Sequence, residues 1–370
     1  MSTSNERRLK NPWPLVAGIV FFLALALSLF FLLAGVSSGL EDYKQGYIHV
    51  SLEVNAAGQV VLDPATDYEA ATAGVKKGDL LLSVNGQPVP ANADDVAKML
   101  GGRVGDLVTI RVQKADGSQE TYTIVRSSHF LKNLEAAGLT LDSRAAYFVT
   151  LSVLVGLLFA ALAVYILLRR PTDWQFVLAA FALLFFPYSL NACYTAHSSA
   201  MVFNLVWLYN LLRASGLLLT FGLLLVFPSG TFVPKWSRWA LVAVAVWVVP
   251  YYISMVIISF LPSVLLDVAW QIIIAIGIGI QVYRYLRVSS VEQRQQTRPM
   301  VIAAVAALIM YLVSWVVNNL VPGSIMSGSA WIWYYLIIEL LVDAALLFFG
   351  FGVARAVRKN VSGPTAWTVK

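Results

Sequence analysis

Three ionisable side chains lie inside long apolar runs of the sequence. Arg213 occupies one run, and Glu339 and Asp343 occupy another. Charge at membrane depth is costly, so a residue of this kind needs a partner or a function. A rise of 1.5 Å per residue places Arg213 and Asp343 about 18 Å, and Glu339 about 12 Å, from the same end of their helices. We therefore predict an intramembrane ion pair between Arg213 and Asp343, with Glu339 one turn away on the same helix face. It would serve packing specificity or signalling.

Residues that could support catalysis or metal binding are scarce. The chain has one cysteine, Cys193, and three histidines, so a Cys/His metal cluster is nearly excluded. An intramembrane zinc protease needs His-Glu-x-x-His on a helix, and the sequence lacks it. An intramembrane serine protease would need Ser327 and His197, which lie in a loop and at a helix end. We expect no catalytic site, no metal and no cofactor, and hence a protein that is not an enzyme.

The composition is that of a chain solvated mostly by lipid. Of its 370 residues 59% are hydrophobic and 12% charged, with a mean hydropathy of +0.72. Apolar runs longer than about 18 residues are typical of transmembrane helices. The first run follows ERRLK and is too long for a cleaved signal peptide, so it predicts a signal anchor. The predicted spans cover residues 13–35, 145–168, 174–195, 201–227, 239–260, 263–286, 299–321 and 331–353.

The charge distribution predicts an orientation for these spans. Residues 41–144 contain 14 acids and 10 bases, a net charge of −4, so the rest of the chain carries +10 to reach the total of +6. If the N-terminus is cytoplasmic, every basic cluster outside residues 41–144 also lies on the cytoplasmic side, as the positive-inside rule requires. We therefore predict a multi-pass protein of the inner or plasma membrane, with cytoplasmic termini and with residues 41–144 outside. The basic excess favours contact with membrane lipids over nucleic acid. The clusters are Arg7, Arg8 and Lys10; Arg169 and Arg170; Lys235 and Arg238; Arg284 to Arg298; and Arg355 to Lys359.

The polar segment between the first two spans has the pattern of a small α+β domain. Apolar and polar residues alternate over 47–54, which predicts a half-buried strand, and further strands are expected at 59–63, 80–84, 107–113 and 120–125. Asn85-Gly86 is a strong hairpin turn because both residues tolerate positive φ. A short helical turn is expected to end at Gly74, and a helix from Asn92 to Leu100.

The stretch AGVKKGDLLLSVNGQPV, Ala73 to Val89, together with this order of elements resembles a PDZ domain over residues 41–127. The resemblance implies that an extended peptide or protein C-terminus is added as a strand to an open sheet edge. The family's Gly-Leu-Gly-Phe-like carboxylate loop is not recognisable in QGYI, so the alternative is a spacer or a module that packs on its own bundle. The implied loop and strand residues are Gly46, Tyr47, Ile48, His49 and Val50, and the apolar pocket is assigned to Val96 and Leu100.

Two loops between later spans carry a second resemblance. LVFPSGTFVPKWSRW, Leu225 to Trp239, and SSVEQRQQTRPMV, Ser289 to Val301, are similar to the membrane sensor half of bacterial histidine kinases of the competence or quorum-sensing type. That family sometimes carries a PDZ domain after its first helix. Pro299 departs from the family pattern, which has Trp there, and no kinase sequence follows the last span. The resemblance implies an output through a separate partner, such as a separate histidine kinase.

Together these observations predict a polytopic α-helical membrane protein with about eight transmembrane helices and one extracytoplasmic PDZ-like α+β domain between the first two. The boundaries are 1–40 for the N-terminus and anchor, 41–130 for the PDZ domain, 131–144 for a linker, 145–356 for a seven-helix bundle and 357–370 for a cytoplasmic tail. The favoured function is a membrane sensor or adaptor that captures a peptide or protein C-terminus. The alternatives are a scaffold that recruits clients to an extracytoplasmic protease, and a ligand-binding membrane protein with a regulatory PDZ domain.

Overall fold

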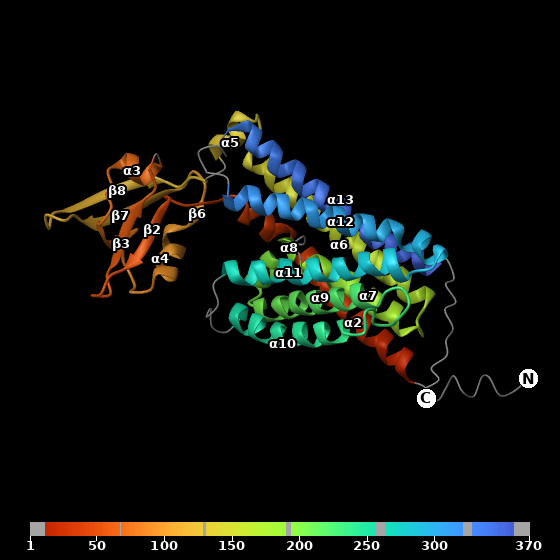
Figure 1. The fold of residues 1–370 in the computed structure, drawn as a ribbon. Helices are drawn as coiled ribbons and strands as arrows, with labels where there is room; N and C mark the ends of the chain where they lie inside the picture. The colour runs from red at the N-terminus through yellow and green to blue at the C-terminus, as the bar shows by residue number, and fades with distance from the viewer. Residues whose placement is uncertain are drawn as a thin grey trace, which may run out of the picture. The chain divides into compact units, whose positions relative to one another are not determined.

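The fold was obtained as a computed structural model, which describes residues 12–66, 68–128, 131–189, 194–256, 263–320 and 328–358. Arg7, Arg8, Lys10, Cys193, Ser327 and the predicted tail beyond residue 358 lie outside these ranges. The chain divides into two compact units (Figure 1). The sheet unit comprises Leu40–Ala146 and Ser327–Trp333, and the helical unit comprises Met1–Gly39, Tyr147–Met326 and Tyr334–Lys370.

The sheet unit is built on an antiparallel sheet with the strand order β2-β3-β4-β7-β8, while β5 pairs with β4 and β1 pairs with β6. Its core contains Leu62, Val84, Val96 and Ile110, which are at most 1% exposed. The elements are β1 (Gln45–Gly46), β2 (Val50–Val54), β3 (Val60–Pro64), α3 (Glu69–Ala73), β4 (Leu80–Val84), β5 (Gln87–Pro88), α4 (Ala93–Leu100), β6 (Gly102–Arg103), β7 (Leu107–Gln113), β8 (Gln119–Val125) and α5 (Leu131–Ala136). The stretch 131–144, predicted as a linker, thus contains a short helix.

The turns follow the local sequence closely. Asn85 and Gly86 have φ values of 48° and 79°, and they connect β4 to β5 with Val84 opposite Gln87. Gly74 ends α3 with a left-handed φ of 105°. Glycine lacks a Cβ and adopts positive φ without strain, and asparagine tolerates it better than most residues, which is why these two residue types specify the turns.

The predicted strand at 47–54 is shorter in the structure, where β2 begins at Val50. His49 has a positive φ of 50°, which interrupts the extended backbone. Before that point, Tyr47 forms an isolated antiparallel bridge with Ser127 instead of extending β2. The alternation of apolar and polar residues over 47–54 therefore spans two separate pairings. Tyr47 pairs with Ser127, and Val50–Val54 pair with β3.

The helical unit contains most of the apolar residues. Seven helices among the described residues are long and apolar enough to cross a membrane: Trp13–Asp42, Leu141–Arg169, Val206–Val226, Ser237–Val256, Val268–Val288, Val291–Val317 and Ser329–Arg358. The elements are α2 (Trp13–Asp42), α6 (Leu141–Arg169), α7 (Trp174–Ser189), α8 (Tyr194–Val202), α9 (Val206–Val226), α10 (Ser237–Val256), α11 (Ser263–Tyr283), the π-helix η1 (Arg284–Val288), α12 (Val291–Leu320) and α13 (Ser329–Arg358). This composition indicates a multi-pass membrane protein.

The third predicted span, 174–195, differs from the others. Its apolar residues form α7, a helix of 16 residues, which is about 24 Å long and shorter than a bilayer core of about 30 Å. Most of α7 is buried, and it packs closely along α9. A Cβ at Gly216 of α9 would lie 2.4 Å from the carbonyl oxygen of Phe185. The absence of a side chain there allows the two helices to approach.

Candidate functional site

The open edge of the sheet is formed by β2, which among the described residues pairs with β3 alone. In β3, the N–H of Leu62 donates to the carbonyl of Asp79 over 2.9 Å, and the carbonyl of Leu62 accepts the N–H of Gly78 over 3.0 Å. The backbone groups of Leu62 therefore face away from β2. Hydrogen-bonded and non-hydrogen-bonded pairs alternate in an antiparallel ladder. Leu52 stands opposite Leu62, and its N–H and C=O therefore point to the open edge. By the same alternation, Val50 and Val54 present their backbone groups there.

Helix α4 lies beside β2 (Figure 1). Its residues Val96 and Leu100, predicted to line an apolar pocket, are 0% and 3% exposed and pack in the core with Ile48. Residues four apart share the face of a helix that meets the sheet. In the structure, Val96 and Leu100 pack α4 against the sheet, and both side chains are buried in the core.

The loop before β2 is occupied by pairing within the domain. Gly46 pairs with Gly102 in the β1–β6 ladder. Tyr47 donates its N–H to the carbonyl of Ser127 over 2.8 Å and accepts the N–H of Ser127 over 2.9 Å. The Tyr47 amide, predicted to contribute to a carboxylate-binding loop, is therefore already hydrogen-bonded.

His49 is buried at the start of this edge. Its Nε2 lies 3.0 Å from the hydroxyl oxygen of Ser127, and its ring centroid lies 4.2 Å from that of Tyr68. Its carbonyl accepts the N–H of Ala65. His49 therefore secures the chain between β1 and β2, and Val50 is the one predicted loop-and-strand residue whose backbone groups face the open edge by the alternation in β2.

Arg126 fixes the far end of α4 and was not singled out from the sequence. Its guanidinium donates to the carbonyls of Leu100 over 2.8 Å, Leu107 over 3.2 Å and Met99 over 3.4 Å. The last carbonyls of a helix have no partner within the helix, and a cation is favoured there. Arg126 thus holds α4 in place beside the edge strand. The sequence signal was weak, since Arg126 follows a strand like many solvent-facing arginines.

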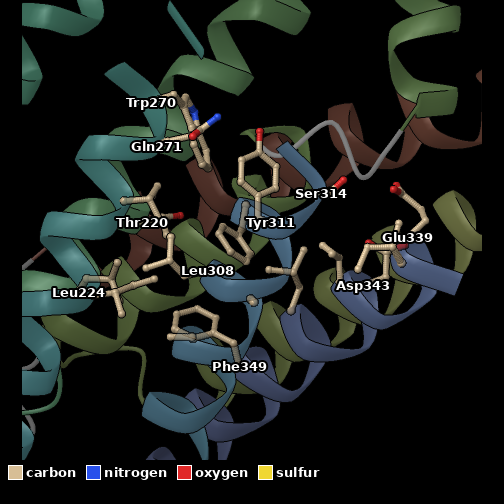
Figure 2. Close-up of a pocket in the computed structure, with 18 residues that line it drawn as sticks. Thr220, Leu224, Trp270, Gln271, Leu308, Tyr311, Ser314, Glu339, Asp343 and Phe349 are labelled. Atoms are coloured by element: carbon tan, nitrogen blue, oxygen red, sulfur yellow. The ribbon is translucent and has the colours of Figure 1, made fainter. Parts of the chain in front are cut away.

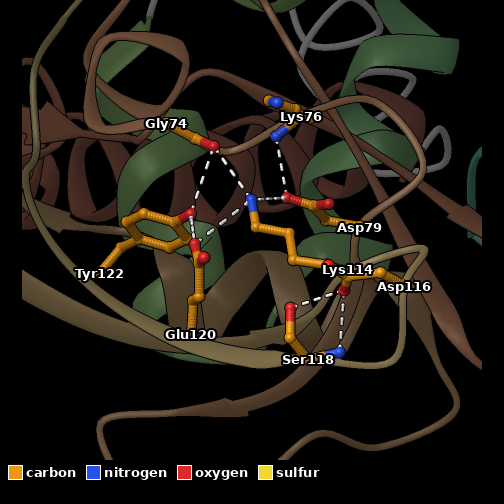
Figure 3. A network of polar contacts seen from close by, with 8 residues as sticks. All are labelled: Gly74, Lys76, Asp79, Lys114, Asp116, Ser118, Glu120 and Tyr122. Carbon is orange, nitrogen blue, oxygen red and sulfur yellow. Dashed lines mark hydrogen bonds and ion pairs between the residues drawn. The ribbon is translucent and has the colours of Figure 1, made fainter.

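A second polar cluster ties the AG-x-x-x-GD motif to the last hairpin (Figure 3). Lys114 Nζ donates to Asp79 Oδ2 over 2.8 Å and to the carbonyl of Gly74 over 3.0 Å. Asp79 Oδ2 also accepts the N–H of Lys76 over 2.8 Å. The hydroxyl of Tyr122 donates to the Gly74 carbonyl over 3.3 Å. The motif therefore encodes a buried anchor for β7 and β8.

Burial and pairing act in opposite directions on Lys114. Desolvation lowers the pKa of Lys114, but hydrogen bonds to Asp79 and Tyr122 and the charge of Asp79 outweigh it, so this pKa is raised. Burial and the hydrogen bond to Glu120 raise the pKa of Tyr122. Both groups therefore hold their protons more tightly in the folded domain.

The predicted ion pair in the helical unit is not formed. Within the described residues no ion pair links Arg213 to Asp343 or Glu339. Arg213 of α9 instead places its guanidinium carbon 6.0 Å from the ring centroid of Tyr251 in α10. Rise along a helix gives depth but not rotation, and matching depths did not place these side chains on facing sides.

Glu339 and Asp343 line a cavity of about 130 Å³ within the helical unit (Figure 2). Its walls come from α7, α9, α11, α12 and α13. Figure 2 shows the labelled polar side chains Trp270, Gln271, Tyr311, Ser314 and Glu339 toward one end, and Leu224 and Phe349 toward the other. The cavity is therefore polar at one end and apolar at the other.

The Leu225–Trp239 loop is held by Arg284, which was predicted only as part of a cytoplasmic basic cluster. Arg284 is 4% exposed. Its guanidinium donates to the carbonyl of Leu225 over 2.5 Å, to that of Thr231 over 3.1 Å, and to the hydroxyl oxygen of Ser229 over 2.6 Å. Arg284 begins the π-helix η1. It supplies partners to the end of α9, so its role is structural.

Comparisons with known proteins address the sheet unit. A sequence model described as PDZ domain matches residues 60–114, so this part of the chain is a PDZ domain. Among solved structures, the photosystem II D1 C-terminal processing protease is similar over 23% of this chain and 23% of its own length, at 22% identity and a TM-score of 0.22. No curated protein matches the chain.

Proposed function

We propose that this chain is a membrane-anchored binding protein whose PDZ domain, on the extracytoplasmic side, captures an extended peptide or protein C-terminus. The observation that carries the proposal is the open edge of β2, where Val50 and Leu52 direct backbone N–H and C=O groups away from β3. An added strand would bond to these groups. The orientation rests on the sequence charge asymmetry.

The output of binding is proposed to pass to a separate cytoplasmic partner, which makes the chain a sensor or adaptor and not an enzyme. What supports this is the insertion of the PDZ domain between the apolar helices α2 and α6 and the loop resemblance to histidine-kinase sensor regions. The occupied amide of Tyr47 leaves fewer donors for a terminal carboxylate. Main-chain pairing with β2 would therefore carry most of the affinity.

We predict that Leu52→Pro weakens peptide binding by the full-length protein in lipid nanodiscs. Proline removes the N–H that faces the open edge, while the bonds between β2 and β3 do not use it. Loss of one hydrogen bond of about 1 kcal/mol corresponds to about a fivefold weaker Kd. The measurement is calorimetric titration with the tightest members of a library of short peptides that end in free carboxylates, for which we expect Kd values of about micromolar.

Two control variants separate strand addition from a general loss of structure. Leu52→Ala shortens the same side chain but keeps the N–H, and should bind more tightly than Leu52→Pro. Val125→Pro removes an outward N–H from β8 at the opposite edge of the sheet and should bind like the wild type. Equal affinities for Leu52→Pro and Leu52→Ala would contradict strand addition. Equal binding of C-terminally amidated peptides would show that a chain end is not recognised.

A further inference from the structure

The cavity among α7, α9, α11, α12 and α13 has two acidic side chains in its wall and, among the described residues, no basic one. Of the described residues that line it, Glu339 and Asp343 are the carboxylic acids, and none is a lysine, arginine or histidine. Within the described part of the chain, neither carboxylate has an ion-pair or hydrogen-bond partner. Burying a carboxylate alone is costly, and the buried charged groups of proteins are therefore usually paired with an opposite charge. The wall therefore favours a positively charged occupant.

A second observation, independent of the acids, points to a ligand. Trp270 Nε1, Gln271 Nε2 and Thr220 Oγ1 are buried and have no hydrogen-bond partner among the described residues. These three residues are 6%, 8% and 2% exposed, and each lines the cavity. A buried donor left unsatisfied costs about 1–3 kcal/mol. An oxygen acceptor on the same occupant would satisfy the indole and amide N–H groups.

The placement of these groups defines the shape of the occupant. In Figure 2, Trp270 and Gln271 of α11 lie on the opposite side of the cavity from Glu339 and Asp343 of α13. Leu224 and Phe349 lie toward the apolar end. The volume of about 130 Å³ is slightly below the roughly 150 Å³ of a cavity known to admit benzene. A cavity of this size accommodates a small molecule, and its apolar end accommodates a short alkyl group.

We propose that this cavity binds a small amphiphilic amine that also carries a hydroxyl or carbonyl oxygen. The ammonium group sits between the carboxylates of Glu339 and Asp343. The oxygen accepts hydrogen bonds from Trp270 and Gln271, and the alkyl group lies against Leu224 and Phe349. This site is separate from the peptide edge of the PDZ domain and does not depend on it.

The test uses the full-length protein in lipid nanodiscs and three matched probes. Leucinol has the ammonium, the hydroxyl and a branched alkyl group. The compound 4-methylpentan-2-amine lacks the hydroxyl, and 4-methylpentane-1,2-diol has a second hydroxyl in place of the amine. Binding to the folded state raises the melting temperature with ligand concentration. We expect the largest rise with leucinol, a smaller rise with the amine and none with the diol. An equal rise with the diol, or none with leucinol, would overturn the proposal.

Variants locate the site. Asp343→Asn and Glu339→Gln keep side-chain size, and each should weaken leucinol binding at least tenfold. Because they remove an unpaired charge, we expect them to fold. Gln271→Met should reduce leucinol binding to the level of the amine probe. Glu292→Gln changes an exposed acid at the start of α12 outside the cavity and should leave binding unchanged. If Asp343→Asn and Glu339→Gln bind leucinol as the wild type does, or if Glu292→Gln weakens binding as much as they do, leucinol binds outside this cavity and the proposal is wrong.

Discussion

Lys114 is the residue whose replacement we expect to be most costly in the PDZ domain. Its side chain is 12% exposed and that of its partner Asp79 is 5% exposed. Removing one member of a buried pair leaves an uncompensated charge, so Lys114→Met should lower the free energy of unfolding by about 3 kcal/mol. The measurement is loss of hydrogen-exchange protection in β4 and β7 of the full-length protein. Lys98→Met is the control, because Lys98 and Asp95 form an exposed pair worth less than about 1 kcal/mol.

The raised pKa values of Lys114 and Tyr122 predict a loss of stability in alkali. A group that binds its proton more tightly when folded stabilises the protein fully below its unfolded pKa, which is about 10.4 for lysine and about 10 for tyrosine. That contribution falls as the pH rises above these values. The protection of β4 and β7 amides from hydrogen exchange, relative to the unfolded chain at the same pH, should therefore decrease above about pH 10. This decrease should be smaller in the Lys114→Met variant. An identical pH profile in the variant would show that Lys114 does not titrate with folding.

The Lys114 cluster shows what the sequence could and could not reveal about single residues. Gly78 and Asp79 were predicted as a turn, and Gly74 as the end of a helical turn, because local backbone chemistry determines both. Their shared partner, Lys114, lies 35 residues away from Asp79 in the sequence, and no local sequence pattern predicts such a contact. The same holds for Arg126 and Arg284, each of which meets carbonyl groups far along the chain.

At the scale of elements, Gly216 tests the contact between α7 and α9. An added Cβ would approach the carbonyl oxygen of Phe185 to 2.4 Å, closer than packed atoms allow. We expect Gly216→Ala to destabilise the helical unit by about 1–3 kcal/mol, as overpacking does. Thermal unfolding in detergent measures the effect. Gly279→Ala is the matched control, since no atom of the described residues lies within 4 Å of its Cβ position and alanine favours a helix. Equal melting of both variants would argue against a close contact at Gly216.

The elements themselves were predicted where pattern and geometry agree. The strand Leu80–Val84 and the hairpin at Asn85-Gly86 match the structure, as does the end of α4 at Leu100. The strand at 47–54 was too long because its alternation hides the change of partner at His49. The Arg213–Asp343 pair was predicted from depth along helices whose relative rotation the apolar pattern does not determine. A nearly uniform apolar surface has no marked polar face to indicate which side meets a neighbour.

At the scale of the whole molecule, the prediction still to be tested is the orientation in the membrane. It places residues 41–144 outside and the basic clusters in the cytoplasm. Single cysteines at Ser118 and at Ser289, in a variant with Cys193 replaced by serine, should react with a membrane-impermeant maleimide from opposite sides. The Ser118 position should be labelled in intact cells, and the Ser289 position only after permeabilisation. Labelling of both positions in intact cells would contradict the orientation.

The insertion of the PDZ domain between α2 and α6 has a consequence for the affinity that its function requires. A module attached at both ends to apolar helices meets a partner in the same membrane by diffusion in two dimensions. Two modules joined by a short flexible linker meet at an effective concentration of about millimolar, and confinement of both partners to one membrane acts in the same direction. A dissociation constant of about micromolar, which strand pairing without a full carboxylate loop would supply, is then sufficient for high occupancy. The same edge would remain mostly empty toward dilute soluble peptides, so under the proposed function a partner in the same membrane would be bound in preference to them.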